Sequence, residues 1–473
     1  MKAPFRVAIA GCGTSGLAAA VELALARSDR QIEITLFDAR HTPGGRTRSF
    51  IDKTTGDVID NGQHLMMGCY TSTLRYLRQI GSLSKLHIQS PLSIPYYRKN
   101  IGKIGSFFVP TFLPVPLNLT VGMINSNLLA AYEKMAALRF GTGVMLFRYD
   151  TLFAEKTCKQ LFVATQQPDT LIEKLWEPVI LATMNTSVAE ASAQVFLNVI
   201  RTIFLTNRKF STLLVPACGL SELLIEPAMS LLEQHRHQVR LSEEITSAHV
   251  RSGVVYLTTN LAKGFETFDA FIIAASPLPD WASEFIDHQN NLSFSPIVNL
   301  YFWLNKKILD SPINGFLGTS VQWAFPKVSQ YSEQMLACTV SAADTLCGLE
   351  PSEITTIIEN DLRGSLPHIK DFTVSHSIVI KEKRATYRLN PVTESERPHC
   401  RTGSPNVFVA SDLATNGLPM TIEGSVRNGV RAAESILNDH LFIQLAETHW
   451  AEKRISLFPR NVETTIPLYH NNE

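Results

Sequence analysis

The N-terminal part of the chain alternates between short apolar runs and a helical pattern. Residues 5–10 form a continuous apolar run that ends at Gly11, which is typical of a buried strand. Small and apolar residues at helical spacing follow over residues 15–27, and a second apolar run covers residues 32–37. A strand, a glycine-rich turn, a helix and a strand in close succession predict a βαβ unit with a parallel sheet.

The same periodicities continue along the rest of the chain, except in one segment. Residues 91–140 carry recurrent prolines among Phe and Leu residues. Because proline disrupts helices and sheets, we expect an irregular apolar surface or a lid there. Elsewhere the spacing of apolar residues predicts helices at residues 160–206, 220–235 and 421–438, and strands near residues 239–258, 270–275, 296–304, 335–340 and 406–410.

The composition excludes several classes of partner. Lys+Arg and Asp+Glu each number 43, so the formal net charge is zero and we expect no nucleic-acid partner, whose phosphates would need a basic face. The seven cysteines are scattered, with no CxxC pair and no zinc spacing. We therefore expect reduced thiols, a cytoplasmic protein and no metal site. The sequence has no uncharged apolar run of about 20 residues, so no membrane-spanning helix is predicted.

A complete GxGxxG motif occupies residues 11–16, between the first predicted strand and the first predicted helix. Gly11 allows a tight turn, Gly13 lets the backbone approach a pyrophosphate, and Gly16 lets the helix pack against the strand. The N–H groups at the start of the helix then face the phosphates. Asp38 follows Gly16 by 22 residues and can accept hydrogen bonds from ribose hydroxyls. The segment therefore predicts a dinucleotide site rather than a glycine-rich turn without a ligand.

The residues after this unit indicate which dinucleotide is bound. Gly44 and Gly45 precede Arg46, a short distance after Asp38. A glycine pair can lie close along the phosphate–ribitol part of a flavin, and the arginine can supply positive charge there. An ordinary basic surface loop is the other interpretation of this segment. Together with the GxGxxG motif, the segment favours FAD as the cofactor.

These motifs resemble those of the flavin-containing amine oxidase and phytoene desaturase superfamily. The shared elements are the GxGxxG motif, the Gly-Gly-Arg segment and a C-terminal Gly-x-Pro-x-Thr-x-Glu-Gly at residues 417–424. Within the superfamily, the chain is most similar to the hydroxysqualene dehydroxylases, the squalene-forming flavoproteins of bacterial hopanoid pathways. Ser411 and Cys218 stand where the superfamily usually has glycine. The motifs that narrow the resemblance lie at residues 60–64 (DNGQH) and 176–178 (WEP). The resemblance also includes residues 185–186 (NT), 191–196 (ASAQVF), 322–323 (QW) and 383–386 (KRAT).

The resemblance and the C-terminal pattern extend the expected FAD site. Asp412 follows the last predicted strand, and residues 417–423 turn into the last predicted helix. Backbone N–H groups at a helix start can stabilise negative charge on the pyrimidine edge of a reduced flavin. A common strand-to-helix junction with a Thr cap is the other interpretation. The expected cofactor-binding residues are Gly11, Gly13, Thr14, Ser15, Gly16, Asp38, Gly44, Gly45, Arg46, Gly62, Gln63, Asp412, Gly417, Met420, Thr421 and Ile422.

Length, pattern and resemblance together predict an α/β protein with interleaved domains. At 473 residues the chain is too long for a single ordinary core. We expect a discontinuous, Rossmann-like FAD-binding domain with a parallel sheet, interleaved with an α+β substrate-binding domain of the amine-oxidase kind. The expected bounds are residues 1–90, 211–275 and 400–440 for the FAD-binding domain, 91–210 and 276–399 for the substrate-binding domain, and 441–473 for a C-terminal tail.

The resemblance implies an FAD-dependent oxidoreductase that removes the hydroxyl group of hydroxysqualene to give squalene, a step of hopanoid and isoprenoid biosynthesis. Reduced flavin would donate the hydride, so the protein also needs an electron donor that reduces FAD. Because hydroxide leaves poorly, an acid must protonate it in a dry, apolar site. His64 is the first candidate acid, since the ordinary pKa of histidine lies near working pH, although a lone histidine is often structural. Asp60 and Glu177 are the second candidates.

An apolar isoprenoid substrate needs an apolar chamber beside the flavin. We expect it between the helices at residues 176–203 and the strands near residues 296–304 and 321–325. The Pro- and Phe-rich segment 106–119 is expected either to make a peripheral contact with the cytoplasmic membrane face or to form a buried lid. Core packing explains each single aromatic residue equally well. The candidate wall residues are Trp176, Phe196, Trp303 and Trp323.

Three other functions stay open on the sequence. A carotenoid-type FAD desaturase shares the fold and substrate class but runs electrons outward to make double bonds, and the sequence does not set the direction of hydride flow. A flavin amine oxidase would need a pocket for a cationic head group, such as an aromatic cage, which the sequence does not locate. A non-catalytic flavin-binding chaperone or assembly subunit is the third alternative.

Overall fold

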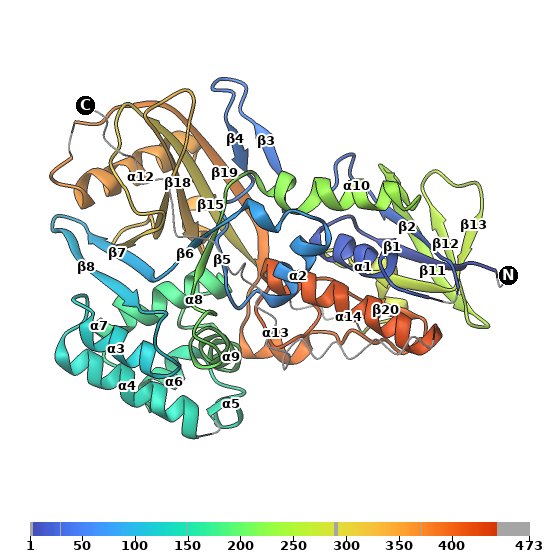
Figure 1. Ribbon diagram of the computed structural model, residues 1–473, viewed down its shortest axis with the longest axis horizontal. Coiled ribbons are helices and arrows are strands. Elements are labelled where there is room, and N and C mark those ends of the chain that lie inside the picture. The colour runs from blue at the N-terminus through green and yellow to red at the C-terminus, as the bar shows by residue number, and fades with distance from the viewer. Residues whose placement is uncertain (1–2, 29, 148, 288–291, 370, 442–473) are drawn as a thin grey trace.

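The computed structural model describes residues 3–28, 30–147, 149–287, 292–369 and 371–441. The protein is elongated, and two lobes lie along its long axis (Figure 1). One lobe contains the first strand and the last helix of the chain, and the other contains a second sheet and a layer of helices. The main sheet of each lobe combines strands that are distant in sequence, so the chain crosses between the lobes several times.

A five-stranded parallel sheet forms the centre of the first lobe. Its strand order is β10-β2-β1-β14-β20, and each neighbouring pair is parallel. The strands are apolar runs because both faces of the sheet are covered. In β1, Val7 and Ile9 pack toward a layer of helices, whereas Ala8 and Ala10 pack toward a small sheet. The strands are β1 (Phe5–Ala10), β2 (Ile32–Asp38), β10 (Gln238–Leu241), β14 (Ala270–Ile273) and β20 (Val407–Val409).

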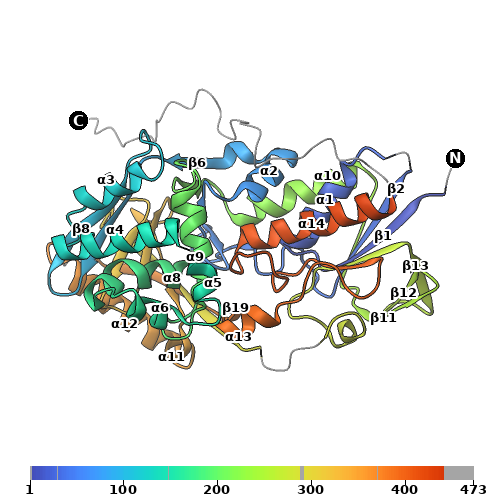
Figure 2. The ribbon, with the colours of Figure 1, turned by 90° about the horizontal axis from the view of Figure 1, so that it is seen from below.

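Helices α1 (Thr14–Ala24) and α14 (Ile422–His440) lie side by side on one face of this sheet (Figure 2). They approach closely because Gly429 has no side chain: a Cβ there would lie 2.1 Å from the carbonyl oxygen of Ser15. The residues that begin both helices line the same cavity, so the sheet and its helices position two helix N-termini together. Helix α10 (Glu226–Gln234) packs beside α1, and the small sheet of β11 (Ile245–Arg251), β12 (Val254–Thr259) and β13 (Phe265–Phe268) covers the opposite face.

A seven-stranded mixed sheet organises the second lobe, in the order β19-β15-β18-β17-β16-β7-β8. Alternation along the central strand β15 decides which side chains face which side. Leu300 and Phe302 pack toward helix α12 (Pro351–Ser365), whereas Tyr301 and Trp303 belong to the core on the other side. The strands are β7 (Leu92–Arg98), β8 (Gly102–Val109), β15 (Phe294–Leu304), β16 (Asn314–Leu317), β17 (Trp323–Lys327), β18 (Gln334–Ser341) and β19 (Val374–Tyr387).

A layer of helices covers the other side of this sheet (Figure 1, lower left). The rings of Phe140, Phe162, Trp176 and Phe196 pack against one another in its core. Two π-helical turns, Ile172–Trp176 and Arg201–Leu205, extend its helices. The helices are α3 (Leu117–Asn125), α4 (Ala131–Leu146), α5 (Tyr149–Leu152), α6 (Cys158–Ala164), α7 (Asp169–Leu171), α8 (Glu177–Met184) and α9 (Ala193–Ile200).

Short elements complete the fold and connect the two lobes. The hairpin of β3 (Ser49–Ile51) and β4 (Val58–Asp60) and a three-stranded sheet in the order β5-β9-β6 lie between the larger sheets. The remaining elements are β5 (Met66–Met67), α2 (Thr71–Gln79), the 3₁₀ turn Leu83–Lys85, β6 (Leu86–Gln89), β9 (Leu213–Pro216), the π-helical turn Ser221–Ile225, the 3₁₀ turn Asp280–Glu284, α11 (Asp344–Cys347) and α13 (Pro391–Glu396).

The prediction of irregular structure over residues 91–140 is wrong. This segment forms the β7–β8 hairpin, α3 and most of α4. Its prolines mark the ends of these elements, because Pro110 and Pro114 stand in the connection after β8 and Pro116 caps α3. Only Pro95 lies inside a strand. Proline density therefore indicated element boundaries here rather than the absence of regular structure.

The observed α/β architecture confirms the predicted fold class. The two large sheets draw their strands from different predicted domains, the parallel sheet from 1–90, 211–275 and 400–440 and the mixed sheet from the rest. The domain bounds themselves stay a proposal. Apart from Leu441, the predicted tail lies outside the described residues. Among the residues that the structure describes, no helix combines the length and apolarity needed to cross a membrane.

Candidate active site

A cavity of about 590 Å³ is lined by residues of both lobes. Its lining includes the GxGxxG turn and the residues that follow β2. It also includes the start of α14, the end of β19 and other strands of the seven-stranded sheet. The cavity therefore joins the predicted dinucleotide site to the predicted substrate lobe.

The GxGxxG turn has the geometry that a pyrophosphate site requires. Gly11 has a φ of +110°, and a Cβ on Gly16 would lie 1.9 Å from the Gly11 carbonyl oxygen, so both positions need glycine for backbone reasons. Gly13 differs, because a Cβ there would meet no atom within 4 Å. The space in front of Gly13 belongs to the cavity, where a phosphate can approach the backbone.

Asp38 is held in place at the end of β2. Its carboxylate accepts hydrogen bonds from the backbone N–H groups of Cys12 (2.8 Å) and Arg40 (2.9 Å). The side chain lines the cavity next to the GxGxxG turn, as a ribose-binding acid should. The following loop folds back over this turn, because Gly44 donates to the Cys12 carbonyl oxygen (2.8 Å) and both Gly44 and Gly45 have positive φ.

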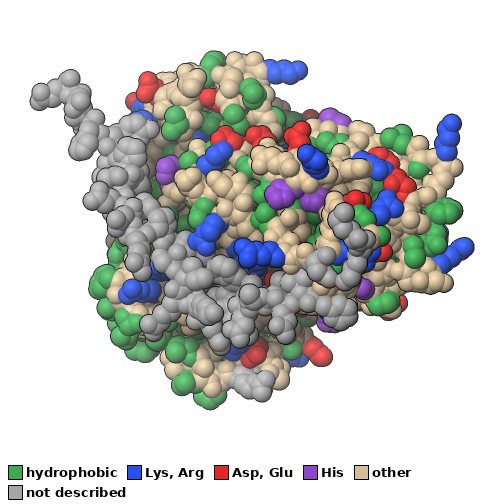
Figure 3. Space-filling view, turned by 45° about the vertical axis from the view of Figure 1, so that its right-hand side comes forward, with side chains coloured by type: hydrophobic (Ala, Val, Ile, Leu, Met, Phe, Trp, Pro, Cys, Tyr) green, Lys and Arg blue, Asp and Glu red, His purple; other side chains and the backbone are tan. Residues whose placement is uncertain are grey.

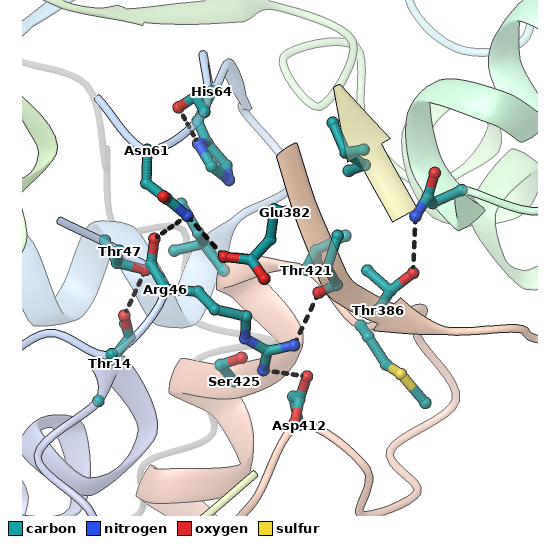
Figure 4. A pocket seen from close by; sticks show the side chains of 18 of the residues that line it. Thr14, Arg46, Thr47, Asn61, His64, Glu382, Thr386, Asp412, Thr421 and Ser425 are labelled. Atoms are coloured by element: carbon teal, nitrogen blue, oxygen red, sulfur yellow. Dashed lines mark hydrogen bonds and ion pairs between the residues drawn. The ribbon is translucent and has the colours of Figure 1, made fainter. Parts of the chain in front are cut away.

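Arg46 extends from this loop across the cavity and forms an ion pair with Asp412 (Figure 4). It also donates to the carbonyl oxygen of Ala385 (2.7 Å), so one side chain ties together the first loop, β19 and the segment after β20. The ion pair outweighs the burial of the guanidinium and raises the pKa of Arg46. The second carboxylate oxygen of Asp412 is buried and has no hydrogen-bond partner among the described residues.

The N-terminus of α14 and the residues before it form another part of the predicted FAD site. Thr421 caps this helix, because its side chain accepts a hydrogen bond from the N–H of Gly424 (3.2 Å). Met420, Thr421 and Ile422 line the cavity, and Gly417, with a φ of +78°, turns the chain into the helix without lining it. The positive end of α14 therefore faces the cavity.

His64 lies in the cavity wall above Glu382 in Figure 4. Its Nδ1 lies 2.7 Å from the carbonyl oxygen of Gly62. A nitrogen that donates to a carbonyl must carry the ring proton, so Nε2 is the unprotonated nitrogen. Burial lowers the pKa of His64 below its ordinary value; the hydrogen bond to Gly62 and the charge of Asp60 oppose this shift, whereas Lys327 and Arg46 add smaller effects in the same direction as burial. The ring is therefore neutral at neutral pH.

Beyond these polar groups, the part of the wall formed by β7, β8 and β17 of the seven-stranded sheet is apolar. A chamber of this kind suits a hydrocarbon, because it offers contacts without polar groups that would need partners. The ring of Tyr96 packs edge-on against Trp323 at a centroid distance of 6.0 Å. The apolar wall residues from this sheet include Leu92, Ile94, Tyr96, Phe107, Trp323 and Phe325.

Comparison with known proteins decides the family. A family model described as flavin containing amine oxidoreductase matches residues 14–437. The chain belongs to this family. FAD is accordingly its cofactor, and the chain is an oxidoreductase, which confirms both predictions.

Three relatives place this flavin-containing amine oxidoreductase more closely. It is 30% identical to a hydroxysqualene dehydroxylase of Sinorhizobium fredii, with 92% of this chain and 99% of the relative covered. It is 23% identical to a zeta-carotene desaturase of Synechocystis sp., with 93% and 99% covered. The solved structure of cyclohexylamine oxidase from Brevibacterium oxydans superposes with a TM-score of 0.64 at 15% identity, covering 92% and 99%, which shows a shared fold.

The residues present fit FAD on two independent observations. The open space at Gly13 gives a pyrophosphate room that any side chain would fill. The unpartnered oxygen of Asp412 is a buried acceptor that a ribityl hydroxyl can satisfy. When bound, FAD would be held by the GxGxxG turn, Asp38, Arg46 and the start of α14. The contact of each of these residues with FAD is a proposal.

The structure brings most of the predicted cofactor residues together. Gly16 and Gly417 do not line the cavity: Gly16 allows α1 to pack on the GxGxxG turn, and Gly417 shapes the turn before α14. Gln63 has a buried side-chain oxygen with no partner among the described residues, which leaves it available to a ligand. The predicted residues that line the cavity are Gly11, Gly13, Thr14, Ser15, Asp38, Gly44, Gly45, Arg46, Gly62, Gln63, Asp412, Met420, Thr421 and Ile422.

The two second-choice acids, Asp60 and Glu177, lie outside the cavity lining. Asp60 accepts hydrogen bonds from the Ser49 hydroxyl (2.7 Å) and the Leu220 N–H (2.9 Å), and it pairs with Lys327 at 3.3 Å. These contacts hold the β3–β4 hairpin in place. Burial, with a smaller contribution from a neighbouring carboxylate, raises the pKa of Glu177, but the side chain does not reach the cavity.

Three of the four predicted wall aromatics are core residues instead. Trp323 lines the cavity as predicted, whereas Trp176, Phe196 and Trp303 do not. Trp176 and Phe196 pack within the aromatic cluster of the helical layer, where Trp176 donates to Gln167 (3.0 Å). Trp303 donates to a carboxylate oxygen of Asp57 (2.7 Å). The spacing of apolar residues marked these side chains as buried but did not show which face of each helix or strand meets the cavity.

Sequence reasoning missed several polar residues of the cavity. Glu382 accepts a hydrogen bond from the Asn61 amide (3.0 Å), and the Asn299 amide donates to the Asn61 carbonyl oxygen (3.3 Å). Asn185 and Thr386 lie on the same wall. The signal for the last two was present, because both belong to motifs that carried the family resemblance, but their spacing alone assigned them no chemistry.

Proposed function

We propose that this oxidoreductase reductively removes the hydroxyl group of hydroxysqualene to give squalene. The observation that carries the proposal is the cavity itself, whose lining combines the GxGxxG turn and the start of α14 with an apolar wall from β7, β8 and β17 and with several polar side chains. A long hydrocarbon with one hydroxyl group matches that distribution. The similarity to hydroxysqualene dehydroxylases, which exceeds the similarity to carotene desaturases, supports the same reaction.

The reaction replaces a C–OH bond by a C–H bond, so it consumes one proton and one hydride and releases water. Reduced FAD, when bound, supplies the hydride, and a separate electron donor must reduce the flavin again after each turnover. The protein must therefore bind the hydrocarbon, exclude water, and deliver a proton to the departing oxygen. The apolar wall around Tyr96 and Trp323 serves the first two needs.

His64 is the residue that we propose for proton delivery. Its Nε2 carries no proton in the neutral ring, so it must first take up a proton, and the lowered pKa makes the resulting imidazolium a stronger acid than an ordinary one. The hydrogen bond to Gly62 fixes the ring orientation while Nε2 gains and loses the proton. Hydroxide then departs as water.

Incubation with both substrate classes tests the proposal against the desaturase alternative. Purified, FAD-loaded protein is given hydroxysqualene under reducing conditions and phytoene under oxidising conditions, and the extracted lipids are identified by mass. We expect squalene from the first reaction and unchanged phytoene in the second. Conversion of phytoene without any squalene formation would assign the chain to the desaturases.

We further propose that the protein collects its substrate at a membrane surface. The segment 106–119 was expected to form either a buried lid or a membrane contact. Phe107 lines the cavity, whereas Phe112 and Leu117 are 74% and 54% exposed, so parts of the segment suit each role. Phe112 lies three residues beyond the end of the hairpin that contributes to the chamber wall, so exposed and enclosed apolar side chains lie close together along the chain. The adjoining helices add exposed Ile124 and Leu146. On the face shown in Figure 3, basic and acidic side chains are interspersed.

A further inference from the structure

Two motifs that the proposed chemistry does not use meet on one wall of the cavity. Asn185 ends α8, and Thr386 lies near the end of β19, 201 positions away. The Asn185 side-chain amide donates a hydrogen bond of 3.0 Å to the Thr386 hydroxyl oxygen (Figure 4). Both residues line the cavity. Their meeting places a threonine hydroxyl in the wall of the cavity.

The orientation of the Asn185 amide is fixed by its surroundings. Its oxygen accepts a hydrogen bond from the backbone N–H of Ala342 (2.7 Å), and its NH₂ group also donates to the carbonyl oxygen of Ser295 (3.0 Å). The residue is buried and holds a left-handed φ of +48°, a conformation that asparagine tolerates better than most residues. Its two N–H groups are thus committed, one to the backbone and one to Thr386.

This commitment leaves Thr386 as a hydrogen-bond donor. Its oxygen already accepts from Asn185, and no acceptor among the described residues takes up the hydroxyl proton. The next residue, Tyr387, donates its backbone N–H to the sulfur of Met420 (3.3 Å), so this end of β19 lies beside the segment that leads into α14. A donor in this position needs an acceptor from the cavity contents.

We propose that the Thr386 hydroxyl donates a hydrogen bond to the hydroxyl oxygen of the substrate, and that it selects an alcohol over the corresponding hydrocarbon. Asn185 is the positioning residue, since it turns the Thr386 proton toward the cavity. This inference rests on the proposed function and specifies how the substrate is recognised. The hydrocarbon product has no oxygen to accept this bond, so the contact also favours exchange of product for substrate.

Equilibrium binding to the oxidised, FAD-loaded protein tests the inference. Hydroxysqualene and squalene are titrated separately in the same detergent, and binding is followed by the change in flavin absorbance. Replacing Thr386 by Val keeps the shape but removes the donor, so we expect affinity for the alcohol to fall about two- to twelvefold, as for one neutral hydrogen bond, and affinity for squalene to stay unchanged. Thr386→Ser should keep the preference. Thr246→Val, on strand β11 outside the cavity lining, is the matched control.

Asn185→Asp provides a second test that leaves Thr386 intact. A carboxylate can only accept, so it should take up the Thr386 proton and turn it away from the substrate. We expect the ratio of the affinities for hydroxysqualene and squalene to fall as it does in Thr386→Val. If Thr386→Val fails to retain FAD, the result of Asn185→Asp alone decides whether the inference holds. An unchanged preference in both variants overturns the inference. If the wild-type protein turns hydroxysqualene into squalene while the preference is unchanged, only the inference fails; if it makes no squalene, the proposed function fails.

Discussion

Replacing Gly13 by Ala should abolish most FAD binding while leaving the protein folded. Gly13 has an ordinary φ of −76°, and a Cβ at this position meets no protein atom within 4 Å. The alanine variant should therefore be as stable as the wild type without FAD, or more stable by about 0.4–1 kcal/mol, because alanine restricts the unfolded chain. The added methyl group instead occupies the space that a pyrophosphate needs.

The magnitude follows from overpacking at a close contact. An extra methyl group in a packed site costs roughly 1–3 kcal/mol, which corresponds to a loss of about 5- to 150-fold in FAD affinity. Gly16→Ala should behave in the opposite way. Its Cβ would lie 1.9 Å from the carbonyl oxygen of Gly11, and a backbone atom cannot move aside, so this variant should lose about 3 kcal/mol or more of folding stability before any ligand is added.

Thermal unfolding of the FAD-free protein and FAD titration by fluorescence separate the two effects. Gly141→Ala is a matched control, because Gly141 lies inside α4 and its Cβ would also meet no atom within 4 Å. This control should gain about 0.8–1 kcal/mol from helix propensity and bind FAD like the wild type. Normal FAD affinity in Gly13→Ala would refute the assignment of the GxGxxG turn as the pyrophosphate site.

Three further predictions concern the substrate half of the protein. His64→Gln should lower kcat while FAD stays bound. In the wild type, kcat/KM should rise as pH falls below about 6.5, because the lowered pKa of His64 confines the protonated ring to acidic pH. The His64→Gln variant should lack this rise. Trp176→Ala should lower the free energy of unfolding by roughly 3–5 kcal/mol, because it leaves a cavity in the core. Trp323→Ala should mainly raise KM, because Trp323 lines the cavity. Chemical denaturation and steady-state kinetics of both variants test this, and a larger rise of KM in Trp176→Ala than in Trp323→Ala would contradict it. Replacing both Phe112 and Leu117 by Ser should reduce flotation with liposomes without changing turnover of detergent-dissolved substrate; equal flotation would remove this surface from the proposed membrane contact.

The FAD half of the site was predictable because local backbone geometry demands particular residues there. Gly11 and Gly16 are required by a left-handed turn and by a carbonyl contact, and both needs are satisfied within one βαβ unit. Asp38 follows at the end of the next strand, where the parallel sheet brings it beside the turn. Short-range geometry of this kind leaves a readable pattern in the sequence.

The substrate half was not predictable to the same depth, because its wall depends on which face of each element meets the cavity. Trp303 and Tyr96 are both buried aromatics on strands of one sheet, yet only Tyr96 lines the cavity. The hydrogen bond between Asn185 and Thr386 joins residues 201 positions apart, and no periodicity encodes that meeting. Tertiary packing, rather than residue type, decides these roles.

The most direct test of the account is a single turnover with prereduced enzyme. The FAD-loaded protein is photoreduced without oxygen, mixed with one equivalent of hydroxysqualene, and followed by flavin absorbance while the lipids are extracted. The account predicts that the flavin reoxidises and that one squalene forms per flavin. When squalene is added in place of hydroxysqualene, the flavin should stay reduced. With hydroxysqualene, a flavin that stays reduced, or that reoxidises without squalene, would contradict the account.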